Sequence, residues 1–191
     1  MLGGACSAAG KSDNVAMLVK VEERSRLDDE ALCEFGEAHP GWKVERVGGT
    51  FVMSPTASNG AGYSSTLSWL LYKWGRGHGY KAFDAQAGFT MPNGDVLSPD
   101  CSLIKKSVWK SLDKAVQSSY AKMALDVVVE VIAKTDRVSQ VRDKCERYLA
   151  YGHKYAVMLD PTRNTAADWG KAPLGFPAPD ELLAELIREN D

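Results

Sequence analysis

The chain has 191 residues, which is long enough for one domain with a hydrophobic core and short for two ordinary domains. Its formal net charge of −2 excludes a general electrostatic attraction to nucleic acid or membranes, so any such contact needs a local basic patch. The four cysteines form no CxxC pair and show no ligand spacing with the three histidines, which argues against structural zinc and for reduced thiols in a cytoplasmic protein.

The first residues differ in composition from the rest of the chain. Small residues dominate residues 1–20, so we expect a disordered leader there and a single domain over residues 21–191. No run of 18 apolar residues occurs, so we expect no membrane span.

The next elements are predicted from apolar spacing and turn residues. Gly48 and Gly49 stand between two alternating segments, a pattern typical of a β-hairpin. The remaining expectations for this part of the chain are a helix over residues 27–38, a loop over 54–62, an amphipathic helix over 62–74, and short strands over 80–83 and 88–91.

A polar strand face and a basic segment follow. We expect one strand over residues 96–104, with Asp100 in the middle of a face lined by small polar groups. Residues 105–122 then hold five lysines and one aspartate, together with Trp109 and Tyr120. We interpret this segment as a solvated loop or short helix, in preference to a nucleic-acid contact, because charge runs are usually surface.

A β-branched run over residues 126–132 is typical of a buried strand, yet it contains two acids. Asp126 and Glu130 share one strand face with Val128 and Ile132, while Val127, Val129 and Val131 share the other. A buried glutamate is stable only when it is paired, hydrogen-bonded or bound to a metal. We assign Asp126, at the strand mouth, a structural or auxiliary role.

The last elements close the predicted domain. A helix capped by Thr135 or Asp136 carries an apolar stripe over residues 138–152, with Lys144 on its flank. We expect a strand over 155–159, a loop over 164–179, a closing helix over 180–187, and helix-capping roles for His78 and His153.

The two acids stand on neighbouring predicted strands. Asp100 and Glu130 can jointly hold a divalent cation such as Mg²⁺, which prefers oxygen ligands, and a nearby lysine can orient water or neutralise charge on phosphorus. A buried ion pair between Glu130 and Lys144 alone would also explain both residues without catalysis.

The chain resembles the Uma-two family of restriction endonucleases, in the PD-(D/E)XK nuclease superfamily, over roughly Leu27 to Pro161. The segments that carry the resemblance are GFTMPNGDVLSPDCSLI, DVVVEVIAKTD, Lys144 with Tyr148 and Gly152, and the apolar strand ending LDP. The resemblance implies an α/β restriction-endonuclease-like fold, with a central mixed β-sheet flanked by helices. It also implies an endonuclease that hydrolyses DNA with Mg²⁺, or Mn²⁺ in its place.

The resemblance also implies the site. Asp100 is then the acid of the PD motif and Glu130 the second acid; both bind Mg²⁺ together with the backbone carbonyl of Val131, and Lys144 positions the attacking water. The standard superfamily lysine would fall at Ile132, so the lysine of the following helix takes its place. Lys134 has the right parity as a partner for Glu130, but four residues along a strand is about 13 Å, so it ranks second.

Two further hypotheses concern the catalytic activity and the oligomeric state. Many relatives carry a glutamate where this chain has Asn59, which motivates an alternative, a catalytically silent nuclease-fold domain that serves binding or assembly. An enzyme of this size that cuts both DNA strands is expected to act as a C₂ homodimer.

Overall fold

The structure is a computed structural model that describes residues 29–39, 42–55, 58–134 and 136–190. The predicted leader over residues 1–20 and the predicted cap residue Thr135 lie outside the described residues. No described helix combines the length and the apolar character needed to cross a membrane.

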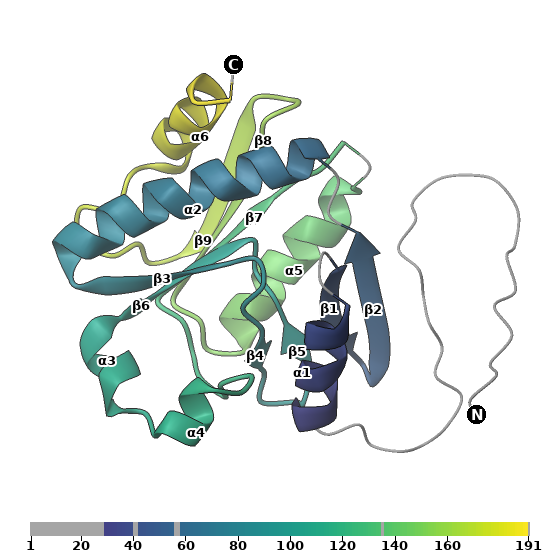
Figure 1. Cartoon of the computed structure of the whole chain (residues 1–191). Helices are drawn as coiled ribbons and strands as arrows, with labels where there is room; N and C mark the ends of the chain where they lie inside the picture. The colour runs from purple at the N-terminus through teal and green to yellow at the C-terminus, as the bar shows by residue number, and fades with distance from the viewer. Residues whose placement is uncertain (1–28, 40–41, 56–57, 135, 191) are drawn as a thin grey trace, which may run out of the picture.

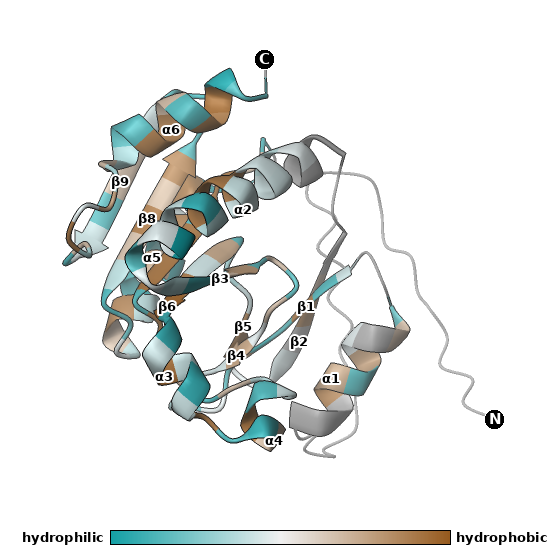
Figure 2. Cartoon of the chain, turned by 60° about the vertical axis from the view of Figure 1, so that its left-hand side comes forward, coloured by the Kyte–Doolittle hydropathy of each residue, from teal (hydrophilic) through white to brown (hydrophobic). Residues whose placement is uncertain are grey.

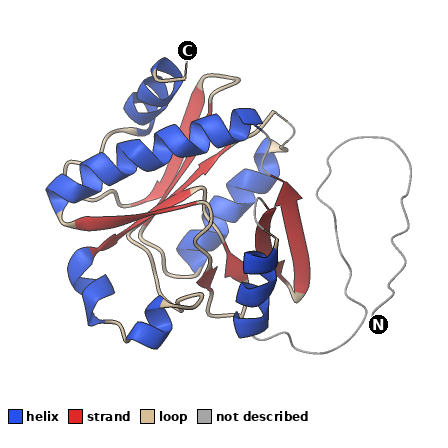
Figure 3. Ribbon diagram, in the orientation of Figure 1, coloured by secondary structure: helices blue, strands red, loops and turns tan. Residues whose placement is uncertain are grey.

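A five-stranded mixed sheet forms the centre of the fold (Figures 1 and 3). Strands β7 and β8 are parallel, and every other neighbouring pair is antiparallel. Helix α5 (Val138–Ala150) makes the crossover that a parallel pair requires. The mixed sheet and its helices confirm the predicted α/β class. The strand order is β3 (Tyr80–Asp84), β6 (Cys101–Lys105), β7 (Val127–Val131), β8 (Tyr155–Asp160) and β9 (Thr165–Gly170).

The two faces of β7 pack against different helices, as the alternation in its sequence predicts. Val127 and Val129 face a core that includes residues of α2 (Ser58–His78) and α6 (Pro179–Arg188). Val128 lies in the opposite core, with residues of α5. All six residues of β8 are buried, and Figure 2 shows this strand as hydrophobic, as expected for a central parallel strand.

A smaller four-stranded sheet packs against helix α1 (Asp29–Ala38) through a cluster that includes Leu32 and Val44. Gly48 and Gly49 have φ values of 57° and 76°, the positive values that a two-residue hairpin turn needs, so the predicted hairpin is confirmed. The sheet order is β2 (Thr50–Pro55), β1 (Trp42–Val47), β5 (Val96–Leu97) and β4 (Phe89–Thr90).

The predicted strand over residues 96–104 is wrong, because it is two strands in two sheets. Val96 and Leu97 form β5 of the small sheet, and Cys101 begins β6 of the large sheet. Pro99 lies in the break, where its missing N–H removes no ladder hydrogen bond. This break places Asp100 at the junction of the two sheets.

Three other boundaries differ from expectation. The loop predicted over 164–179 is wrong in its first part, because residues 165–170 form β9 along the full length of β8. Helix α2 extends beyond the predicted 62–74, and it ends where Gly79 adopts φ 78°. Arg137 stands at the N-cap of α5, because Asp136 instead accepts a hydrogen bond from the Ala133 N–H. The basic segment forms two short helices, α3 (Lys106–Ser111) and α4 (Lys114–Gln117).

Candidate active site

Asp100 and Glu130 lie side by side across strands β6 and β7. The antiparallel register pairs Cys101 with Val129, which sets the preceding Asp100 opposite Glu130. The Val131 N–H donates to Asp100 Oδ2 at 2.8 Å, so the backbone of Val131 adjoins the same carboxylate. The structure therefore brings Asp100 and Glu130 together, and the contact that it shows from Val131 is made by the N–H of that residue.

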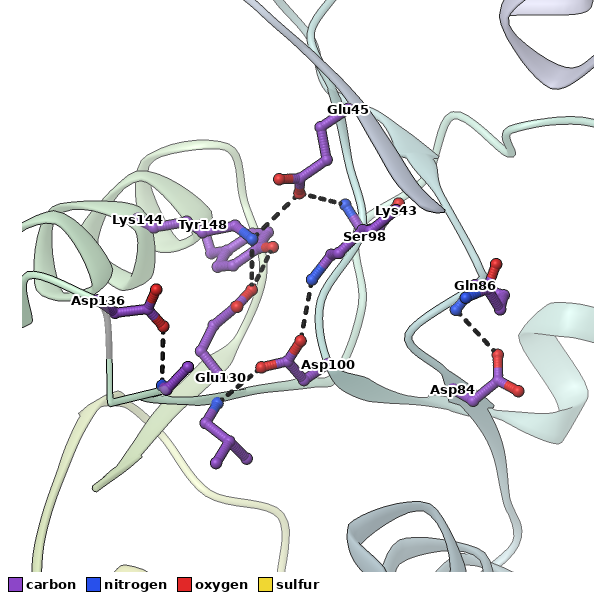
Figure 4. A network of polar contacts seen from close by, with 12 residues as sticks. Lys43, Glu45, Asp84, Gln86, Ser98, Asp100, Glu130, Asp136, Lys144 and Tyr148 are labelled. Carbon is purple, nitrogen blue, oxygen red and sulfur yellow. Dashed lines mark hydrogen bonds and ion pairs between the residues drawn. The ribbon is translucent and has the colours of Figure 1, made fainter. Parts of the chain in front are cut away.

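Lys144 reaches this pair from helix α5 (Figure 4). Its Nζ lies 2.9 Å from Glu130 Oε1. Cys145 and Tyr148 of α5 are both buried and anchor the helix on the sheet. Lys144 directly precedes Cys145, and its side chain reaches Glu130 of β7. The Tyr148 hydroxyl donates to the same Glu130 oxygen at 2.8 Å. Glu130 is thus held by two groups of one helix.

Strand β1 brings two more charged residues that sequence reasoning did not select. Lys43 Nζ lies 2.9 Å from Asp100 Oδ1, and Glu45 Oε1 lies 3.1 Å from Lys144 Nζ. The Ser98 N–H donates to the same Glu45 oxygen at 2.8 Å. Lys43 and Glu45 are two residues apart and share one face of β1, opposite Val44 in the core. In the sequence this face looks like a solvent-facing strand surface, and only the pairing of β1 with β5 turns it toward the acids.

We call the five residues Lys43, Glu45, Asp100, Glu130 and Lys144 the charge cluster. The side chains of all five are at most 19% exposed. Charges this deeply buried need partners, and each member has one of opposite sign within 3.1 Å.

The charge cluster shifts the pKa values of its acids in different directions. Burial would raise the pKa of Asp100 and of Glu45, but the nearby Lys43 and Lys144 outweigh burial and lower both. For Glu130 burial outweighs the lysines, so its pKa is raised. Asp100 and Glu45 are therefore the more firmly ionised members of the cluster.

Both lysines stay protonated at neutral pH. Burial would lower the pKa of Lys144, but Glu130, Glu45 and Asp100 together raise it well above the ordinary lysine value. The pKa of Lys43 is raised against burial chiefly by Asp100. In this state Lys144 can donate hydrogen bonds and supply positive charge, but it cannot accept a proton.

Asp100 and Glu130 are the described residues of the cluster that could hold Mg²⁺. Mg²⁺ is commonly held by one or two carboxylates, with waters and substrate phosphate completing its shell. Glu130 supplies such oxygens from β7, and Asp100 supplies them from the position just before the neighbouring β6. Within the described ranges, no three Asp, Glu, His or Cys side chains form a group that could hold a metal by themselves. The ammonium groups of Lys43 and Lys144 contact these carboxylates, so a bound cation would compete with them.

Three positions that differ from the expected catalytic pattern are also located in the structure. Ile132 is 3% exposed and lies in an apolar cluster, so no lysine occupies the standard superfamily position. Lys134 is exposed and forms no ion pair in the part of the chain that the structure describes. Asn59 lies in the first turn of α2, and its side chain is outside the described residues.

Asp126 and two histidines lie away from the charge cluster. Asp126 accepts from the Lys105 N–H and pairs with Lys154 at 2.6 Å, a structural arrangement at the start of β7. His78 Nδ1 bonds the Trp74 carbonyl at the end of α2, a capping contact. His153 is buried, where its Nδ1 accepts from the Leu125 N–H, so it caps no helix.

Comparisons with known proteins agree with this architecture. The family model described as "Uma2: Putative restriction endonuclease" matches residues 28–169. A crystal structure from Anabaena variabilis ATCC 29413, titled "a putative nuclease belonging to DUF820", is similar with a TM-score of 0.58 and 13% sequence identity. The match covers 77% of this chain and 90% of that chain, and at this identity it shows a shared fold. None of the curated proteins matches the chain.

Proposed function

The chain belongs to the Uma2 family of the restriction-endonuclease-like nucleases, and from this premise we propose that it is a metal-dependent endonuclease that hydrolyses DNA phosphodiester bonds. The observation that carries the proposal is the convergence of Asp100, Glu130 and Lys144, from three separate elements, in one buried charge cluster. Burial of five charged groups is costly, and a fold needs no such cluster for stability alone.

The two acids have the role of metal ligands in this proposal. Asp100, Glu130 and the Val131 carbonyl would hold Mg²⁺ or Mn²⁺, which when bound polarises the phosphate and lowers the pKa of a coordinated water. The Val131 N–H donates to Asp100 Oδ2 and thereby fixes the orientation of that carboxylate. The Tyr148 hydroxyl does the same for Glu130.

Lys144 has the role of positioning the attacking water and neutralising charge that develops on phosphorus. Its raised pKa keeps it as an ammonium group, so it acts by donating hydrogen bonds and by its charge. Glu45 accepts from Lys144 and also accepts a hydrogen bond from the Ser98 N–H. We assign Glu45 as the positioning residue of Lys144, and Lys43 as a second cation next to Asp100.

One observation favours a second candidate function. Every member of the charge cluster is already paired, so the cluster also fits a catalytically silent domain that keeps the nuclease fold for binding or assembly. Such a domain would neither bind divalent cations at Asp100 nor cut DNA.

Nicking of supercoiled plasmid by the full chain separates the two candidates. We expect cutting with Mg²⁺ or Mn²⁺ that EDTA abolishes, and a loss of about 10²-fold or more in Asp100→Asn, Glu130→Gln and Lys144→Met. Arg142→Ala and Glu146→Gln, exposed residues of α5, are the matched controls and should cut normally. Equal inertness of the natural chain and all variants, across both metals, would refute the nuclease proposal.

A metal titration gives a readout that does not depend on cutting. Calorimetry with Mn²⁺ should show one site in the natural chain, and Asp100→Asn should abolish it while Glu146→Gln leaves it intact. Absence of binding in the natural chain would support the silent domain.

A homodimer would let one site address each DNA strand. Sedimentation velocity with a duplex oligonucleotide should then show two protein chains per duplex. One protein chain per duplex would argue that the enzyme cuts only one strand of the duplex at a time.

A further inference from the structure

A hollow of ≈ 310 Å³ lies between the end of β3, the loop that follows it, and helices α3 and α4. We call it the Trp109 pocket. Its size is at the lower end of the ~300–1,000 Å³ typical of small-ligand sites. Aromatic rings line it together with polar groups: Phe83, Phe89, Trp109 and Tyr120 supply rings, and Gln86, Ser118 and Ser119 supply amide and hydroxyl groups.

A lysine stands over the rings of this pocket. Lys81 Nζ lies 4.7 Å from the centroid of Trp109 and 5.1 Å from that of Phe83, which is cation–π geometry. Within the described part of the chain, Lys81 forms no ion pair with a carboxylate. Among the described residues its ammonium group contacts ring faces, which leave its full positive charge available to an anion.

The pocket adjoins the charge cluster. Gly88 lines the pocket, and a Cβ placed on it would lie 3.2 Å from Ser98 Oγ; the Ser98 N–H holds Glu45. At the other end of the same loop, Asp84 pairs with Cys101, the residue after Asp100. Residues 84–88 therefore connect the pocket with residues that adjoin the charge cluster.

The surroundings of the pocket are basic in a chain whose net charge is −2. Helices α3 and α4 belong to residues 105–122, which contain five lysines and a single acid, Asp113. Most of these lysines are exposed, as a phosphate contact requires. The sequence alone favours a solvated surface here, because the neighbouring rings of β3 and the pocket are not evident from it.

We propose that the Trp109 pocket binds a nucleobase of the nucleic-acid substrate, stacked on Trp109, with Lys81 and the lysines of α3 and α4 contacting the flanking phosphates. This inference rests on the proposed nuclease function and names how its substrate is held. Stacking on aromatic rings beside a basic track is the usual way in which proteins hold single-stranded nucleic acid. Because a paired and stacked base cannot enter such a pocket, the substrate at this point is single-stranded or locally opened.

Fluorescence anisotropy with a labelled single-stranded oligonucleotide of mixed sequence, in EDTA, tests the pocket without cutting. Trp109→Leu should weaken binding about tenfold, while Trp109→Phe should keep it within about threefold. Lys81→Gln should weaken binding and reduce the slope of log K against log salt by about 0.7, the contribution of one phosphate contact on a single strand.

Helix α2 offers a matched control for this experiment. Trp69 and Lys73 form the same kind of pair, at 4.8 Å, on a helix that covers the opposite face of the large sheet. Trp69→Leu and Lys73→Gln should bind within about twofold of the natural chain. Poly-glutamate that carries the same total charge as the oligonucleotide, but no bases, should not displace it. Unchanged binding in Trp109→Leu, equal weakening in Trp69→Leu, or displacement by poly-glutamate would each overturn the proposal.

The two proposals can fail separately. Nicking that requires Asp100, together with binding that ignores Trp109, overturns the pocket alone. If binding requires Trp109 but the protein never nicks DNA, base binding in the pocket is supported and the nuclease proposal is refuted.

Discussion

Lys144→Met should destabilise the fold strongly, because it removes one cation from the charge cluster while keeping the apolar body of the side chain. Glu130 and Glu45, whose side chains are 6% and 13% exposed, would then lose their shared ion-pair partner. Removing one member of a buried pair costs about 3–5 kcal/mol, since the remaining charge stays buried without compensation. We expect that loss in the free energy of unfolding, measured by urea titration and circular dichroism in EDTA.

A double-mutant cycle separates the ion pair from other effects of the substitution. Glu130→Gln removes the stranded carboxylate, so the Lys144→Met/Glu130→Gln double variant should lose much less than the sum of the single losses. Arg188→Met is the matched control, because Arg188 pairs with Glu185 while 67% exposed, and it should cost about 1 kcal/mol or less.

The same variant tests whether the carboxylates bind cations. With Lys144 removed, Mg²⁺ meets less competition, so added Mg²⁺ should stabilise Lys144→Met more than the natural chain, through preferential binding to the folded state.

Two results of the urea titrations would refute the account of the buried ion pair. One is a loss of unfolding free energy in Lys144→Met no larger than that in Arg188→Met. The other is single losses that add within about 0.5 kcal/mol in the double variant.

Three further predictions concern neighbouring groups. Tyr148→Phe removes a hydrogen bond to the Glu130 carboxylate and should cost about 1.5–3 kcal/mol in urea unfolding; a smaller loss than in an exposed tyrosine variant would argue against that bond. Glu45→Gln should slow plasmid nicking less than Glu130→Gln does, because Glu45 acts only through Lys144, and the reverse order would contradict its positioning role. Burial lowers the pKa of His153 to about 4, below its ordinary 6.5, so its contribution to stability is complete above pH 6.5 and is lost as the pH falls toward 4. Between pH 7 and 4.5 the natural chain should lose about 2–3 kcal/mol more than His153→Asn, and parallel pH profiles would exclude this account.

The central strand could be predicted from the sequence because its signal is local. Alternation with a period of two assigned Val127 and Val129 to one core and Val128 to the other, and the structure confirms both. Glu130 interrupts an apolar run, which marks it as a candidate site residue without any knowledge of the fold.

Groups that reach the site through long-range pairing could not be found in this way. Lys43 and Glu45 reach Asp100 and Lys144 because Arg46 of the same strand pairs with Val96. Nothing near β1 in the sequence indicates that pairing. The strand break at Pro99 has the same origin, since residues on its two sides belong to sheets that only the folded chain separates.

An edge strand leaves a weaker signal than a central one. Residues 165–170 are partly or fully exposed throughout β9 and include two alanines and a glycine, so they lack the apolar run by which β8 was recognised. The helix predicted over residues 62–74 is shorter than α2 for a related reason. Gly75 and Gly77 are typical helix breakers, yet Gly75 lies inside the helix, where a Cβ would approach Tyr80 and Leu103 at 3.3 Å.

Anomalous scattering from a Mn²⁺-soaked crystal of the full chain tests the central claim most directly. The account predicts one strong anomalous peak between the carboxylates of Asp100 and Glu130, with the ammonium groups of Lys43 and Lys144 moved off the oxygens that they now contact. Unchanged ion pairs at saturating Mn²⁺, with no peak at these two carboxylates, would contradict it.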